Sequence, residues 1–153
     1  MRARRVIATV GVVGIAGALA FGGIAAAGDD DFDARMDGAS EVPGPGDPDG
    51  KGEAEIEIDV DAGEVCFEFE WEDIATPTAG HIHAGAAGVA GPIVVDLLGG
   101  ASPDALESDD EYEACVPGDA EVLEAIVANP DQYYANLHNP RFPAGAVRGQ
   151  LSD

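Results

Sequence analysis

Hydrophobic and acidic residues alternate along two neighbouring segments of the chain. In residues 54–60 the even positions are apolar and the odd positions are acidic. In residues 65–71 the odd positions are apolar, and glutamates occupy two of the three even ones. A period of two is typical of a β-strand with one buried and one solvated face. Because residues 61–63 are turn formers, the two segments are predicted to form a β-hairpin.

Shorter segments of the same kind, separated by Gly- and Pro-rich loops, predict further strands. They are residues 32–42, 80–85, 92–97, 112–116, 133–138 and 146–151. One helix is expected after Asp119, a good N-cap, and it ends before Pro130. The pattern therefore predicts an all-β fold. We expect an antiparallel β-sandwich of seven or eight strands, Greek-key and immunoglobulin- or superoxide-dismutase-like, with one short helix.

The N-terminal segment has the three parts of a secretory signal. Residues 1–5 are basic, residues 6–27 are uncharged, and the small residues Ala25, Ala26 and Ala27 precede an acidic stretch. We expect a signal peptide over residues 1–27, with cleavage after Ala27, and a single domain over residues 28–153. The protein is then secreted or extracytoplasmic, with no membrane attachment once the signal is removed. The alternative is an uncleaved membrane anchor, because the uncharged stretch is long enough to span a bilayer.

The charge of the chain is strongly negative. It has 7 Lys and Arg residues against 30 Asp and Glu residues, a net charge of −23. Cleavage after Ala27 would remove Arg2, Arg4 and Arg5 and lower the net charge to −26. Such a surface repels nucleic acids and anionic lipid, so neither is an expected partner. Self-repulsion also predicts a soluble monomer that is stabilised when salt screens its charge.

The two cysteines, Cys66 and Cys115, are expected to form a disulfide in an oxidising compartment. Closing a loop of about 50 residues stabilises the fold by roughly 4 kcal/mol in the chain-entropy model. Metal-binding or redox-active thiols are the alternative. The wide spacing of the cysteines and the lack of a neighbouring histidine argue against it.

The three histidines, His81, His83 and His138, are the main candidates for chemistry. Residues two apart in a strand point to the same face, so His81 and His83 are expected to project together. His138 can add a third imidazole, and three imidazoles suit copper or zinc. Asp96 and Tyr134 are candidates for a fourth ligand. The alternative is structural: the rings hold glycine-rich loops by hydrogen bonds, and no metal is needed.

Three segments together resemble the CHRD domain, named for chordin. They are residues 38–43, the glycine-rich Gly80-His81-Ile82-His83-Ala84-Gly85 with its continuation to residue 95, and residues 129–151. The closing segment contains Tyr134, Asn136, Arg148 and Gln150, which are expected to have structural roles. The resemblance implies a β-sandwich and secretion, as in single-domain bacterial members. It does not imply an enzyme. The His-x-His strand is also similar to the copper-binding strand of Cu/Zn superoxide dismutases, whose full ligand set three histidines cannot supply.

Two functions follow as hypotheses. The first is a secreted, non-enzymatic binding or structural module whose partner is an extracellular protein or glycan. The second is an extracytoplasmic copper- or zinc-binding protein, with redox activity as a further option, that uses His81, His83 and His138. Motifs of hydrolases and of nucleotide-binding proteins are missing from the sequence.

Overall fold

The structure is a computed structural model that describes residues 30–107 and 110–153. Its strands are β1 (Asp30–Asp37), β2 (Lys51–Asp59), β3 (Glu64–Glu72), β4 (Ala79–Ala84), β5 (Ile93–Asp96), β6 (Glu111–Pro117), β7 (Tyr133–His138) and β8 (Val147–Gln150). The helices are α1 (Pro103–Glu107) and α2 (Ala120–Ala128), and the 3-10 turns are η1 (Gly38–Ser40) and η2 (Pro130–Gln132). The predicted signal peptide lies outside the described residues.

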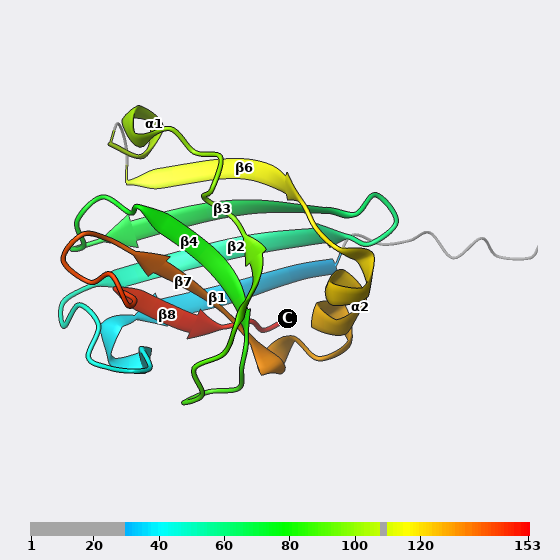
Figure 1. Cartoon of the computed structure of the whole chain (residues 1–153), viewed down its shortest axis with the longest axis horizontal. Helices are drawn as coiled ribbons and strands as arrows, with labels where there is room; N and C mark the ends of the chain where they lie inside the picture. Colours follow the sequence, from blue (N-terminus) through cyan, green and yellow to red (C-terminus); the bar gives the residue numbers. More distant parts are fainter. Residues whose placement is uncertain (1–29, 108–109) are drawn as a thin grey trace, which may run out of the picture.

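All eight strands belong to one antiparallel sheet in the order β5-β4-β7-β8-β1-β2-β3-β6. The sheet bends so that the half made of β5, β4, β7 and β8 passes in front of the half made of β1, β2 and β3 (Figure 1). The halves are joined where Asp37 of β1 pairs with Arg148 of β8. The predicted all-β antiparallel fold is confirmed. Its two layers are halves of one continuous sheet.

Alternating apolar side chains from both halves form a single core. Phe67 and Phe69 of β3 contribute from one half, and Ile82 of β4 and Leu137 of β7 contribute from the other. The predicted β2–β3 hairpin is present, with Ile56 opposite Phe67. Because the apolar residues of both halves face inward, the outer faces of the sheet carry the polar ones.

The structure differs from the prediction at two places, the end of the first strand and an additional short helix. The first strand ends at Asp37 rather than at residue 42, because the Asp37 side chain accepts a hydrogen bond from Ser40 N and caps the turn η1. The helix α2 begins after Asp119 as predicted, with the Asp119 side chain accepting from Glu121 N and Val122 N. The five-residue helix α1 was not predicted. Within the described ranges, no helix has the length and apolar character needed to cross a membrane.

The outer face of β2, β3 and β6 carries the disulfide and rows of carboxylates. Cys66 lies opposite Cys115 in the pairing of β3 with β6, and the predicted disulfide joins them. Next to it, Glu68 lies between Glu55 of β2 and Glu113 of β6. Slight desolvation and the neighbouring glutamates raise the pKa of Glu68. Like charges directly opposite each other destabilise a sheet, so this face loses stability at low ionic strength.

Candidate functional site

The outer face of β4, β7 and β8 carries a second polar group of residues, which is not acidic. Ile82 points into the core, so its neighbours His81 and His83 share the outer face, as their spacing predicts. Pairing with β7 places His81 opposite Asn136 and His83 opposite Tyr134. The polar residues of this face are His81, His83, Tyr134, Asn136, His138, Arg148 and Gln150.

The loop of residues 85–92 covers part of this face and takes it out of water. Arg148 Nη2 donates to the carbonyl oxygen of Ala86 at 2.9 Å, and Gln150 Nε2 donates to that of Gly85 at 3.0 Å. The backbone N–H of Gly91 donates to the Tyr134 hydroxyl at 3.2 Å. Arg148 is therefore only 1% exposed although it lies on the outer side of the sheet.

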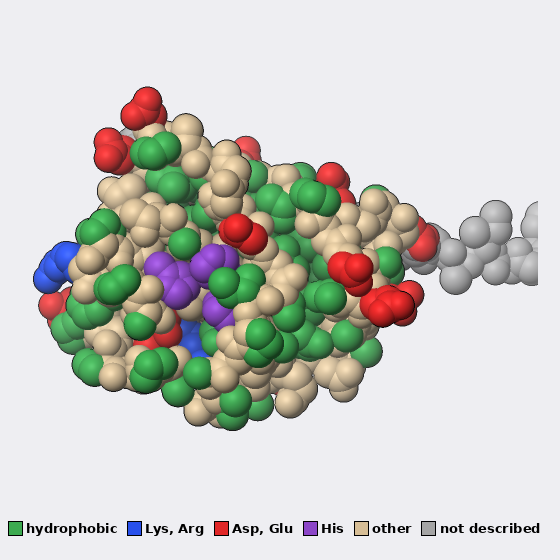
Figure 2. Space-filling view, viewed as in Figure 1, with side chains coloured by type: hydrophobic (Ala, Val, Ile, Leu, Met, Phe, Trp, Pro, Cys, Tyr) green, Lys and Arg blue, Asp and Glu red, His purple; other side chains and the backbone are tan. Residues whose placement is uncertain are grey.

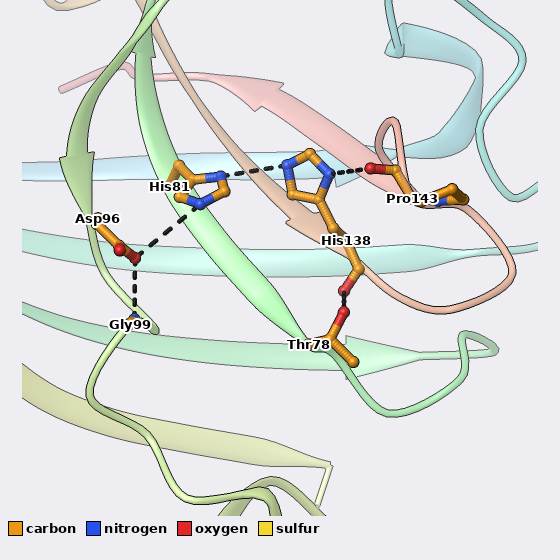
Figure 3. A network of polar contacts seen from close by, with 6 residues as sticks. All are labelled: Thr78, His81, Asp96, Gly99, His138 and Pro143. Carbon is orange, nitrogen blue, oxygen red and sulfur yellow. Dashed lines mark hydrogen bonds and ion pairs between the residues drawn. The ribbon is translucent and has the colours of Figure 1, made fainter.

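The three histidines meet on this face. One ring nitrogen of each lies within 4.8 Å of those of the other two. His81 Nδ1 and His138 Nε2 are 3.2 Å apart (Figure 3). In the space-filling view, the three side chains gather in a hollow of the surface, with basic and acidic atoms visible beside them (Figure 2). The structure thus brings together the residues that the sequence suggested as metal ligands.

Backbone carbonyls fix the proton on two of the rings. His83 Nδ1 lies 2.9 Å from the carbonyl oxygen of Gly91, and His138 Nδ1 lies 3.1 Å from that of Pro143. A carbonyl oxygen only accepts, so Nδ1 carries the proton in both rings. The second nitrogen of each ring, Nε2, is then the atom that can accept a hydrogen bond or bind a metal. His138 Nε2 faces His81 Nδ1, whereas His83 Nε2 is buried and has no hydrogen-bond partner in the part of the chain that the structure describes.

The proton of His81 is placed less favourably. If Nδ1 donates to His138, the lone pair of Nε2 faces Asp96, whose Oδ1 is 4.0 Å away (Figure 3). Burial and the neighbouring histidines lower the pKa of His81 to about 4, although Asp96 and Asn136 act in the opposite direction. Burial also lowers the pKa of His138, with the Pro143 carbonyl opposing the effect. His81 and His138 are therefore neutral near pH 7.

The ring of Tyr134 packs flat against the ring of His83. The two rings are stacked, with centroids 4.8 Å apart and an angle of 5° between their planes. The guanidinium carbon of Arg148 lies 3.4 Å from the centroid of the Tyr134 ring. Since β7 lies between β4 and β8, Tyr134 separates the imidazole from the guanidinium. This stack fixes the plane of His83.

Several buried polar atoms at or near this face have no hydrogen-bond partner among the described residues. They are Glu41 Oε1, Asp47 Oδ2, His83 Nε2, Asn136 Oδ1 and Arg148 Nη1. Leaving such an atom unsatisfied costs about 1–3 kcal/mol, and more for a charged group. His83 and Asn136 belong to adjacent strands of the polar face, so their two unpartnered lone pairs belong to the same site.

The sequence did not point to Glu41. Glu41 is 4% exposed, its carboxylate lies against Gly145, and burial raises its pKa to about 7 against the opposing charge of Arg148. Its position in the segment 38–43 was the one available signal. Of the two suggested fourth ligands, Asp96 lies beside the Nε2 atom of His81 and outside the three-imidazole group. The Tyr134 hydroxyl accepts from Gly91.

Comparison with known families gives one match. The model of the CHRD domain family matches residues 32–151. No curated protein matches the chain. The matched range begins in β1 and ends just after β8, so it includes the sheet except for the first two residues of β1, and it includes all three histidines.

Proposed function

The chain belongs to the CHRD domain family, and from this premise we propose that it is an extracytoplasmic binding module whose ligand is a single copper or zinc ion held by His81, His83 and His138. The family supports a β-sheet module, and the disulfide fits a protein outside the cell. The polar face described above supplies the ligands.

The observation that carries the proposal is the unpartnered Nε2 atom of His83. This atom is buried beside two other imidazoles and has no hydrogen-bond partner among the described residues. His81 Nδ1 and His138 Nε2 are separated by 3.2 Å. Two nitrogens bound to one tetrahedral ion at about 2.0 Å are about 3.3 Å apart. An ion between these rings would therefore need little rearrangement of the pair.

Metal binding also resolves the position of the His81 proton. An ion at Nδ1 displaces the proton from that atom, and the ring then carries its proton on Nε2. This proton points toward Asp96, whose Oδ1 is 4.0 Å away. Histidine ligands commonly direct their second nitrogen to a carboxylate or a backbone carbonyl. His83 and His138 already do so through Gly91 and Pro143.

The structural role of the histidines is compatible with this function. In His83 and His138, Nδ1 holds a loop, while Nε2 of each ring faces the other histidines. The same ring can thus anchor the loop and bind the ion. Holding the loop fixes the direction of the lone pair, which favours binding because less freedom is lost.

The proposal is tested by loading the purified protein, expressed from the full chain, with one equivalent of copper or zinc. After removal of free ions, bound metal is measured by elemental analysis. We expect one tightly held ion in the wild type and none in the variant His81→Ala/His83→Ala/His138→Ala. Circular dichroism of both proteins checks that the variant retains its fold.

A second variant controls for binding by surface acids. Glu68, Glu70 and Glu111 place carboxylate oxygens within 4.8 Å of one another on the opposite half of the sheet. The variant Glu68→Gln/Glu70→Gln/Glu111→Gln should retain the ion. Equal metal retention by the wild type and the triple-histidine variant would refute the proposal. Loss of metal from both would do the same and would direct attention to a protein or glycan partner.

A further inference from the structure

Asn136 occupies the centre of the polar face. Its strand β7 pairs with β4 on one side and with β8 on the other. Asn136 therefore lies between His81 of β4 and Arg148 of β8, directly opposite each. Along β7, Tyr134 and His138 are two residues away and point to the same side. His83, opposite Tyr134, is its diagonal neighbour. Asn136 is thus next to all three imidazoles.

The carboxamide of Asn136 is buried and its oxygen is unused. The residue is 2% exposed, and Oδ1 has no hydrogen-bond partner among the described residues. His83 Nε2 and Asn136 Oδ1 are therefore two buried acceptor atoms that have no hydrogen-bond partner among the described residues. A cation bound between the two residues would satisfy both lone pairs.

We infer that Asn136 Oδ1 is the fourth ligand of the ion, so that the site has three imidazole nitrogens and one carboxamide oxygen. This inference rests on the proposed function. Asp96 is excluded from the role because it lies beside the far nitrogen of His81. Tyr134 is excluded because its ring lies flat against His83 and its hydroxyl accepts from Gly91.

This ligand set favours copper over zinc. Structural zinc sites are built mainly from cysteine and histidine, whereas copper sites accept a side-chain amide oxygen as a weak ligand beside imidazole. A fourth protein ligand also occupies the position that catalytic three-histidine sites leave open for water or substrate. The inferred ligand therefore assigns the ion to binding rather than to catalysis.

Two substitutions at the same position separate ligation from packing. Asn136→Leu keeps the size of the side chain and removes the oxygen. Asn136→Asp keeps an oxygen in place. We expect Asn136→Leu to bind Cu(II) roughly 10- to 100-fold more weakly than the wild type. Asn136→Asp should restore the affinity. Affinity is measured by competition with a chelator, and thermal melts of the copper-free proteins report any loss of stability.

The electron paramagnetic resonance spectrum of the Cu(II) protein provides a second readout, with azide as a probe of open positions. In the wild type, azide should leave the spectrum unchanged. In Asn136→Leu, azide should bind at the vacated position and change the spectrum. Equal copper affinity and an equal azide response in the two proteins would overturn the inference and leave the three-histidine site intact. If the wild type binds no copper, the proposed function itself fails.

Discussion

Replacing Glu41 with glutamine tests how the buried polar layer responds to pH. Burial raises the pKa of Glu41 to about 7 from an ordinary value of 4.5, and Arg148 opposes this effect without cancelling it. Where the unfolded state binds fewer protons than the folded state, stability falls as pH rises. Between pH 4.5 and about 7, folded Glu41 retains a proton that the unfolded chain has released. Glu41 therefore costs the fold stability as the pH rises through this window.

The magnitude follows from the shift. The difference between 4.5 and about 7 corresponds to about 3 kcal/mol, at about 1.4 kcal/mol for each pKa unit. Glutamine has the shape of the protonated acid and does not titrate. The free energy of unfolding of the wild type, relative to Glu41→Gln, should thus fall by about 3 kcal/mol from about pH 4 to about pH 8.

The assay is equilibrium unfolding in urea, an uncharged denaturant, at a series of pH values and constant ionic strength. The surface carboxylates contribute equally to both proteins, so the difference isolates Glu41. A difference that stays constant across the pH range would refute the reasoning. So would a difference that grows in favour of the wild type, because Arg148 would then stabilise the ionised carboxylate more than burial penalises it.

Three further predictions concern the rest of the fold. Cys66→Ser/Cys115→Ser should lower the free energy of unfolding by about 2–4 kcal/mol in urea titrations, and a loss below about 0.5 kcal/mol would contradict a stabilising disulfide. Gly145→Ala should cost about 1–3 kcal/mol, because Gly145 has a φ of +139° and the carboxylate of Glu41 lies against it; an unchanged melting temperature would argue against strain there. Sodium chloride should raise the melting temperature from low to moderate concentration, whereas a fall would show that carboxylate repulsion does not limit stability.

The fold was predictable because its strands alternate regularly. Residues 54–60 and 65–71 specify their buried faces by period, and Asp119 and Pro130 mark the limits of α2. The end of β1 was not predictable in the same way. Residues 38–43 contain apolar positions that continue the strand pattern, and the Asp37–Ser40 hydrogen bond that ends the strand depends on local backbone geometry. Alternation also does not reveal whether two layers are joined in one sheet.

The site was predictable only in part. The spacing of His81 and His83 gives their common face. The position of His138 beside them depends on the pairing of β4 with β7, whose paired residues are 49 to 59 positions apart in the sequence. Asn136 was identified as a structural residue from the family resemblance. Its unused oxygen becomes visible only when burial and hydrogen bonds are known. Glu41 could not be distinguished by sequence from the other acidic residues.

The two halves of the sheet present different ligand atoms to cations. The rows of glutamates on β2, β3 and β6 offer hard, exposed oxygens, which suit loosely held calcium or magnesium ions. The face of β4 and β7 offers imidazoles, which suit copper and zinc. The net charge of −23 concentrates all cations near the surface, so charge alone selects none of them. Selectivity must come from the donor atoms, and the free Nε2 of His83 is the donor for which no competing proton or carbonyl partner exists among the described residues.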